Sequence, residues 1–221
     1  MGLCREDLVA GHFAELVRQL TPSGTLTFLS EEEREASLQT TLAAAPPGDV
    51  WLFGYGSLMW SPAFLYEDAL PALLRAWHRR FCLWTPLGRG TPECPGLVLG
   101  LERGGACRGV VFRIARDRAE EELRLVWRRE MLSGAYVPRW VTLDSPQGPL
   151  RAITFTINRT HARYAGRLDE TEVARHVAVA EGHLGTCREY LHESVNALEA
   201  LGISDSSMAR LVTLVAQIIH T

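Results

Sequence analysis

The middle of the chain contains a series of short apolar segments that end at glycine or proline, and this pattern restricts the fold more than any other feature. Apolar runs of four to eight residues between turn residues are typical of β-strands. The segments expected to form strands are residues 50–55, 80–84, 97–101, 109–114, 140–143 and 151–157. Because short turns rather than helices join most of them, the pattern favours a mainly antiparallel or mixed sheet that could close on itself.

Helical patterns lie between these strands and after them. Near the C-terminus, we expect helices over about residues 170–181, 187–201 and 205–219. The segment Ser-Pro-Gln-Gly-Pro at residues 145–149 predicts a hairpin turn between the last two strands. Strands with helices grouped around them, rather than in regular alternation, predict the α+β class.

The first 48 residues differ from the rest of the chain. One short amphipathic helix is expected from the apolar residues Leu8, Phe13, Leu16, Val17 and Leu20. An acidic run after a serine, at residues 30–35, predicts the start of a second helix, and an alanine- and proline-rich linker follows it. We therefore expect residues 1–48 to form a helical extension and linker, and residues 49–221 to form the main domain.

Composition excludes several classes of protein. The chain has 221 residues, of which 47% are hydrophobic and 22% charged, as expected of a globular domain with its own core. Its net charge of −3 argues against binding to nucleic acid. The sequence contains neither an apolar stretch of about 18 residues nor a secretory signal, so we expect no membrane association and a cytoplasmic location.

Cysteine and histidine spacing argues against a structural metal site or a disulfide framework. The five cysteines are scattered and form no CxxC pair: Cys4, Cys82, Cys94, Cys107 and Cys187. His176 and His183 lie seven residues apart, but a glycine intervenes and no carboxylate grouping accompanies them, so no metal is expected. A cysteine nucleophile stays open, although no feature of the sequence points to one.

A glycine-containing segment follows the first predicted strand: Phe53-Gly54-Tyr55-Gly56-Ser57-Leu58-Met59-Trp60. Two glycines allow the backbone to turn sharply and to present successive N–H groups, which can hold a carboxylate or a polarised carbonyl oxygen. Met59 stands where a dinucleotide fingerprint or a Gly-x-Ser-x-Gly motif requires glycine, and no lysine follows as in a Walker loop. The alternative is an ordinary glycine turn without a ligand.

A predicted helix between Asp117 and Gly134 carries a carboxylate on its apolar face. Leu123, Val126, Trp127, Glu130 and Met131 recur at helical spacing, and Asp117 with Glu120 resembles a capping box. A buried carboxylate has a raised pKa, which suits a general base working near neutral pH. The alternative is a structural glutamate neutralised by an arginine or by backbone N–H groups.

Two further residues have open roles. Ser57 is a conceivable nucleophile, but no Asp/His pair accompanies it in the sequence, so a binding role is favoured. Tyr190 lies on an apolar helical stripe and is expected first to pack in the core. Its hydroxyl could in addition serve a buried polar site.

Several of these segments together resemble the ChaC family of γ-glutamylcyclotransferases. The resemblance covers roughly residues 49–215, in order. The matching segments are residues 53–60, Arg89–Leu97, Trp127–Met131 with Gly134–Tyr136, Tyr164–Gly166, and Tyr190–Leu191 with Leu201–Asp205.

The resemblance implies a fold, an activity and a set of site residues. The implied fold is a γ-glutamylcyclotransferase-like small mixed β-barrel with surrounding helices and a helical C-terminal part. The implied activity is the cleavage of glutathione to 5-oxoproline and Cys-Gly without a cofactor. Glu130 matches the catalytic acid/base, residues 53–58 match the loop that holds the γ-glutamyl group, and Tyr190 matches a tyrosine near the substrate. Whether Arg89 and Thr91 contact substrate or only shape a loop stays open.

The implied chemistry needs no nucleophile from the protein, because the substrate amine can attack its own γ-carbonyl. Glu130 would remove a proton from the substrate ammonium and return it to the departing nitrogen. Two alternatives stay open: a cyclotransferase for other γ-glutamyl peptides or amines, and a catalytically silent glutathione-binding or regulatory module. The sequence does not determine the oligomeric state.

Overall fold

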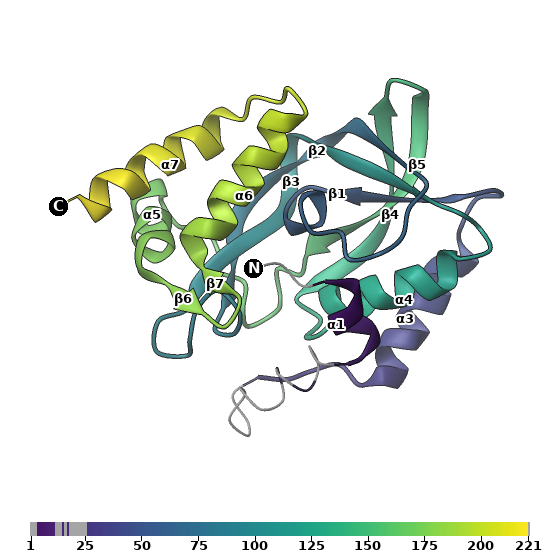
Figure 1. The fold of residues 1–221 in the computed structure, drawn as a ribbon, viewed down its shortest axis with the longest axis horizontal. Coiled ribbons are helices and arrows are strands. Elements are labelled where there is room, and N and C mark those ends of the chain that lie inside the picture. The colour runs from purple at the N-terminus through teal and green to yellow at the C-terminus, as the bar shows by residue number, and fades with distance from the viewer. Residues whose placement is uncertain (1–3, 12–14, 16, 18–25, 221) are drawn as a thin grey trace.

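Five strands close into a barrel in the order β1-β3-β2-β4-β5 (Figure 1). The computed structural model describes residues 4–11, 15, 17 and 26–220. The strands are β1 (Val50–Gly54), β2 (Asp68–Thr85), β3 (Gly96–Ile114), β4 (Tyr136–Ser145) and β5 (Gly148–Ile157). β1 pairs with β5 in parallel and with β3 antiparallel, and the other strand pairs are antiparallel. The predicted small mixed barrel is confirmed.

Strands β2 and β3 are much longer than the sequence pattern indicated. Residues 97–101 and 109–114 were expected to be separate strands, but both belong to β3, which has 19 residues. Residues 80–84 are only the end of β2, which has 18. Register shifts between Arg75 and Trp77 and between Phe81 and Leu83 interrupt the alternation of side chains along β2. Such bulges hide a continuous strand from a pattern of period two.

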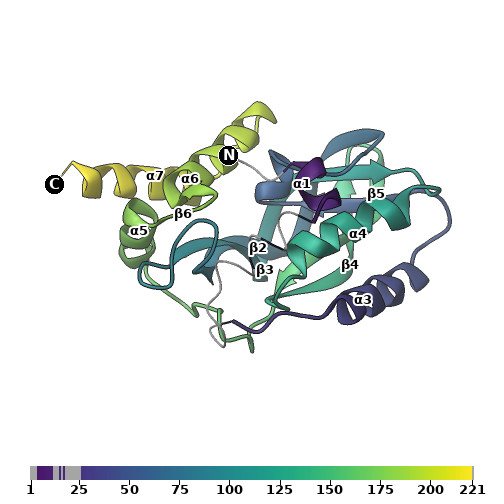
Figure 2. The same cartoon turned by 60° about the horizontal axis from the view of Figure 1, so that its bottom comes forward.

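The helices form two groups on opposite sides of the barrel (Figures 1 and 2). The C-terminal group packs on one side and completes a core cluster with Phe53, Leu99 and Val111. A second cluster, which includes Phe112 and Phe155, joins the barrel to the other group. The helices are α5 (Glu170–Val179), α6 (Cys187–Ala200) and α7 (Ser206–Ile219) in the first group, and α1 (Arg5–Val9), α3 (Glu31–Ala43) and α4 (Ala119–Glu130) in the second.

Helix α3 packs against α4 and against β4. Trp127 Nε1 of α4 donates a hydrogen bond to Ser37 Oγ at 3.2 Å, and Trp140 Nε1 of β4 donates to Thr41 O at 2.9 Å. Ser30 caps the start of α3, as the sequence predicted. Of the residues predicted to form the first amphipathic helix, Phe13, Leu16 and Leu20 lie outside the described residues. The division between residues 1–48 and 49–221 stays a prediction.

Helix α4 differs from the prediction at its start. Its N-cap is Arg118, and no side chain caps it. The predicted capping box from Asp117 to Glu120 is therefore wrong, because the helix begins one residue too late for Asp117 to take the cap position. Acidic residues in the first turn still interact favourably with the helix dipole. The helix ends at Glu130, and Gly134 adopts a positive φ of 70° in the turn that leads to β4.

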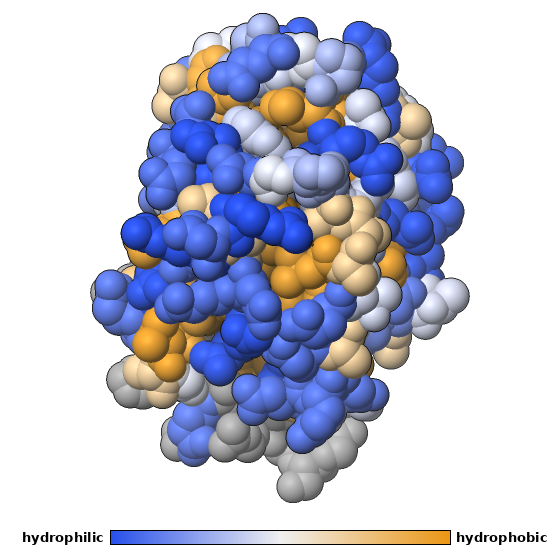
Figure 3. Space-filling model, turned by 90° about the vertical axis from the view of Figure 1, so that its right-hand side faces the viewer, coloured by the Kyte–Doolittle hydropathy of each residue, from blue (hydrophilic) through white to orange (hydrophobic). Residues whose placement is uncertain are grey.

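The described residues on the face at the right of Figure 1 form no large apolar area. Apolar side chains appear there in small patches separated by hydrophilic ones (Figure 3). In the described part of the chain, no helix has both the length and the apolar character to cross a lipid bilayer.

Candidate active site

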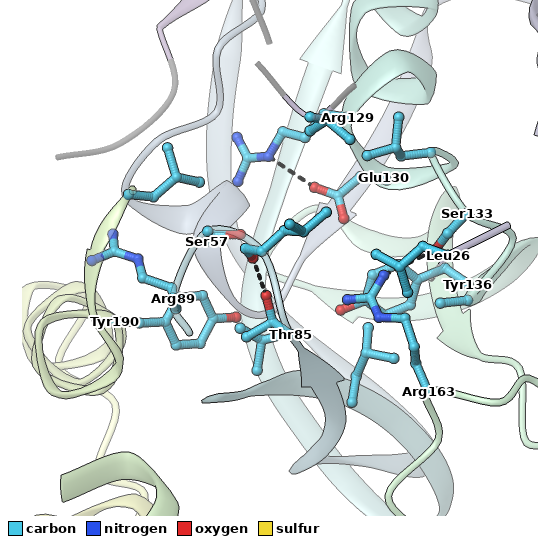
Figure 4. A pocket seen from close by; sticks show the side chains of 18 of the residues that line it. Leu26, Ser57, Thr85, Arg89, Arg129, Glu130, Ser133, Tyr136, Arg163 and Tyr190 are labelled. Atoms are coloured by element: carbon cyan, nitrogen blue, oxygen red, sulfur yellow. Dashed lines mark hydrogen bonds and ion pairs between the residues drawn. The ribbon is translucent and has the colours of Figure 1, made fainter. Parts of the chain in front are cut away.

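A cavity of about 180 Å³ opens beside the barrel, where several parts of the chain meet (Figure 4). These parts include the turn after β1, the β2–β3 hairpin, the exit of α4, and α6. A smaller cavity of about 20 Å³ adjoins it and is lined by the glycine turn. Four of the described residues line both cavities: Ser57, Glu130, Tyr136 and Tyr190. The structure thus brings Glu130 to the glycine turn, although the two are far apart in the sequence.

Glu130 is the last residue of α4, and its side chain is only 13% exposed. Its Oε1 lies 3.0 Å from Arg129 Nε, and no other polar contact to its carboxylate is found among the described residues. Burial raises the pKa of this carboxyl above its ordinary value of 4.5, while the charge of Arg129 opposes the shift. A single ion pair leaves the carboxylate able to exchange a proton with a ligand in the cavity.

The glycine turn joins β1 to a short 3₁₀ helix, η1 (Ser57–Met59). The first hydrogen bond of η1 runs from Met59 N to Gly56 O at 2.8 Å. The N–H groups of Ser57 and Leu58 precede that bond and have no partner within the turn. They are therefore available to an oxygen atom in the adjoining cavity.

Space, rather than a left-handed backbone, makes glycine necessary in this turn. Neither Gly54 nor Gly56 has a positive φ, and that of Gly56 is −138°. A Cβ on Gly56 would lie 3.0 Å from the Tyr190 hydroxyl oxygen, and one on Gly54 would lie 2.9 Å from Leu58 Cβ. The close approach of Gly56 to Tyr190 links the turn to α6.

The predicted loop residues divide into two groups. Tyr55, Gly56, Ser57 and Leu58 line the smaller cavity. Phe53 and Gly54 line neither cavity, because the Phe53 side chain is fully buried in the barrel core and Gly54 is covered by Leu58 and Phe112. Any part that these two residues have in binding is indirect, through the position of the turn.

A buried arginine holds the turn in place. Arg79 Nη1 donates a hydrogen bond to Tyr55 O at 2.7 Å, and Nη2 donates to Arg108 O on β3. Its Nε forms an ion pair with Asp205, the N-cap of α7, at 3.2 Å. The Tyr55 hydroxyl donates to Phe155 O at 2.8 Å. The turn is therefore fixed to the barrel at both its backbone and its side chain.

Two tyrosines contact the backbone of one residue, Leu99, in the cavity floor. The Tyr136 hydroxyl donates to Leu99 O at 2.7 Å, and the Tyr190 hydroxyl accepts from Leu99 N at 3.4 Å. Burial raises the pKa of Tyr190 to about 12 and that of Tyr136 well above its ordinary value. Both phenols therefore stay protonated, and Tyr190 keeps its proton to donate to a ligand. Tyr136 was not predicted as a site residue, since its segment was noted only as the exit of the predicted helix.

The structure separates the roles of Arg89 and Thr91, which the sequence left open. Arg89 is buried, lines the larger cavity, and contacts Thr186 O and Glu189 Oε2, each at 3.1 Å. Thr91 is absent from both cavity walls. Its N–H donates to Cys94 O and its hydroxyl accepts from Cys94 N, both at 3.1 Å, so it shapes the hairpin loop.

The cysteines are poorly suited to nucleophilic attack. Burial raises the pKa of Cys82 to about 12 and that of Cys187 to about 11, so both thiols stay protonated near neutral pH. None of the five cysteines lines either cavity. Within the described ranges, no three His, Cys, Asp or Glu side chains lie close enough to hold a metal ion.

Comparison with known proteins identifies the family. A sequence model described as "ChaC-like protein" matches residues 50–218. This chain belongs to the ChaC-like family. The resemblance seen in the sequence is therefore confirmed, and the match extends from the start of β1 nearly to the end of α7.

Named relatives of this ChaC-like protein come from bacteria and animals. A protein of Escherichia coli named glutathione-specific γ-glutamylcyclotransferase is 41% identical over 192 residues, which cover 86% of this chain and 83% of the relative. A human protein named glutathione-specific γ-glutamylcyclotransferase 1 is 30% identical over 173 residues, or 75% of this chain and 78% of the relative.

A solved structure supports the fold of this family member. The crystal structure of a γ-glutamyl cyclotransferase specific to glutathione from yeast matches with a TM-score of 0.73 and 22% sequence identity. The match covers 78% of this chain and 98% of the yeast chain. The barrel with its attached helices is therefore the γ-glutamylcyclotransferase fold, as the resemblance implied.

Proposed function

We propose that this protein is a glutathione-specific γ-glutamylcyclotransferase, which cleaves glutathione to 5-oxoproline and Cys-Gly. The observation that carries the proposal is the position of Glu130, a shielded carboxylate that faces the glycine turn across a cavity. The names of the Escherichia coli and human relatives supply the substrate.

The reaction begins with a proton transfer from the substrate. The α-ammonium of the γ-glutamyl group cannot attack a carbonyl until it loses a proton. Glu130 accepts this proton, and its raised pKa brings the carboxyl nearer to the working pH than an exposed glutamate would be. The freed amine then attacks the γ-carbonyl of the same molecule and forms the five-membered ring.

The cavity walls supply orientation and charge stabilisation. Holding the γ-glutamyl chain in a folded, near-ring geometry lowers the entropic part of the barrier by up to several kcal/mol. Negative charge develops on the γ-carbonyl oxygen as the C–N bond forms. The N–H groups of Ser57 and Leu58 and the hydroxyl of Tyr190 are the donors that stabilise this oxygen or hold the α-carboxylate.

The second half of the reaction returns the proton. The C–N bond between the γ-carbon and the cysteine nitrogen breaks, and Glu130 gives its proton to the departing nitrogen. The ring nitrogen loses its second proton, which the departing amine takes up as it becomes an ammonium. The products are 5-oxoproline and Cys-Gly, and Glu130 regains its starting state. One carboxyl thus serves as base and then as acid without a redox partner or a covalent enzyme intermediate.

We place the enzyme in the cytoplasm with a small-molecule substrate as its partner. All five cysteines are free, which suits a reducing compartment. Glutathione itself is a thiol and is abundant only in its reduced form where the surroundings are reducing.

Incubation with reduced glutathione tests the proposal directly. Chromatography should show 5-oxoproline and Cys-Gly in equal amounts, and a panel of other γ-glutamyl peptides and amines should give slower release of 5-oxoproline. Equal rates across the panel would favour the broader cyclotransferase. Calorimetric binding of glutathione without any 5-oxoproline would favour the silent binding module.

A further inference from the structure

The arginines of the site are unevenly distributed between the two cavities. Three of the arginines that the structure describes line the larger cavity: Arg89, Arg129 and Arg163. None of the described arginines lines the smaller cavity beside the glycine turn. Figure 4 shows Arg163 with Ser133 and Tyr136 on one side of the larger cavity, opposite Arg89 and Tyr190. The part of a ligand that extends away from the glycine turn therefore meets an excess of positive charge.

Two of these arginines have carboxylate partners in the protein. Arg89 Nη1 lies 3.1 Å from Glu189 Oε2, and Arg129 Nε lies 3.0 Å from Glu130 Oε1. Their charges are compensated before any ligand enters. Either could contact a ligand, but neither requires one to balance its charge.

Arg163 differs because its described contacts are neutral. Its Nε donates to Trp84 O at 2.7 Å, and its Nη1 donates to Ser133 Oγ at 3.0 Å. Its side chain is partly buried, and burial lowers the pKa of the guanidinium. No ion pair joins it to any described carboxylate, and the sequence outside the described residues contains no aspartate or glutamate. A partly buried cation without a counter-charge is costly, and a ligand carboxylate would relieve that cost.

We propose that Arg163 binds the glycine carboxylate of glutathione and thereby selects glutathione over γ-glutamyl compounds that lack this group. The inference rests on the proposed function, because that function places the γ-glutamyl end in the smaller cavity. Ser133 holds the guanidinium in position through its hydroxyl.

The dimensions of the substrate fit this assignment. In an extended peptide each residue spans about 3.3–3.6 Å, so the glycine carboxyl carbon lies roughly 7 Å from the scissile carbonyl. Ser133, which contacts Arg163, is three residues after Glu130. The two Cα atoms are therefore at most about 11 Å apart. Glu130 and Arg163 line the same cavity, so a Cys-Gly unit that starts beside Glu130 extends toward the Arg163 side chain.

A binding cycle with two enzymes and two ligands tests the inference. The enzymes are the full chain carrying Glu130→Gln, which blocks turnover, with and without Arg163→Gln. The ligands are reduced glutathione and its C-terminal glycinamide, which differ only in the carboxylate. Titration calorimetry should show that the Arg163 enzyme prefers the carboxylate by about ten- to hundredfold, the range expected of a charged hydrogen bond. Arg163→Gln should reduce this preference to less than about twofold.

Two control variants separate a binding role from a structural one. Arg163→Lys keeps the charge and should retain part of the preference, although its shape no longer matches the carboxylate. Arg159→Gln removes the same charge from a side chain that is 65% exposed and lies outside the cavity walls. It should leave the preference unchanged. If Arg163 had only a structural role, Arg163→Gln would weaken the binding of both ligands equally.

Several outcomes would overturn the assignment. These are no preference for the carboxylate with Arg163 present, an unchanged preference after Arg163→Gln, and no binding of either ligand. Release of 5-oxoproline by the unaltered enzyme is scored separately. Turnover of glutathione without a role for Arg163 would refute only this inference, whereas a carboxylate preference without turnover would refute only the proposed activity.

Discussion

Replacement of Glu130 by glutamine is the most decisive perturbation of the proposed mechanism. Glutamine has the same shape as glutamate but cannot accept the proton of the substrate ammonium. General acid–base catalysis by a positioned side chain contributes roughly 10²–10⁴-fold to turnover. We expect Glu130→Gln to reduce kcat by at least this factor, which corresponds to about 3–5 kcal/mol in the activation free energy.

The pH dependence provides a second readout of the same group. Burial raises the pKa of Glu130, so the acidic limb of kcat/KM should have its midpoint above the ordinary value of 4.5. The carboxyl binds a proton more tightly in the folded state than in the unfolded state. Glu130 therefore lowers stability as pH rises from 4.5 through its folded pKa, and below 4.5 this effect is absent. Glu130→Gln should remove this loss of stability, and it should also remove the acidic limb of the kcat/KM profile.

The assay measures 5-oxoproline released from glutathione by purified enzyme, together with circular dichroism to verify the fold. Glu121→Gln is the matched control, because Glu121 lies on the same helix with its side chain 72% exposed. This control should keep full activity. A folded Glu130→Gln enzyme that releases 5-oxoproline at close to the normal rate would refute the role of Glu130 as the base.

Three further perturbations test the surroundings of the site. Gly56→Ala places a Cβ 3.0 Å from the Tyr190 hydroxyl oxygen and should raise KM and weaken the calorimetric affinity for glutathione. Adding Tyr190→Phe should recover part of that loss in affinity. If the effects of the two substitutions on affinity were simply additive, that would argue against this contact. Arg79→Met removes a buried guanidinium that holds the glycine turn, and should lower the free energy of unfolding in urea by about 3–5 kcal/mol. Arg124 lowers the pKa of Glu35 to about 2, so their ion pair contributes stability that is present above pH 4.5 and lost as pH falls toward 2. Because both side chains are about a third exposed, Glu35→Gln should remove no more than about 1 kcal/mol at pH 7, and a larger loss would point to packing.

Local patterns in the sequence were sufficient to predict the elements that depend on neighbouring residues alone. Turn residues at 145–149 predicted the hairpin between β4 and β5, and helical spacing around Glu130 predicted α4. The same reasoning missed the full lengths of β2 and β3. Ala76 adopts a positive φ of 64° at a bulge, and Gly104 and Gly105 also have positive φ, so the alternation of side chains is broken within single strands.

The sequence alone determined which segments are proposed to carry the chemistry, because a carboxylate on an apolar helix face and a glycine turn after a strand are properties of neighbouring residues. Only the tertiary structure decided what these segments face. The closed barrel and the helices packed on it bring Tyr136, Arg163 and Tyr190 to the cavity of Glu130 from three separate parts of the chain. No spacing in the chain encodes such a meeting, since it depends on the register of paired strands and on the packing of helices against them.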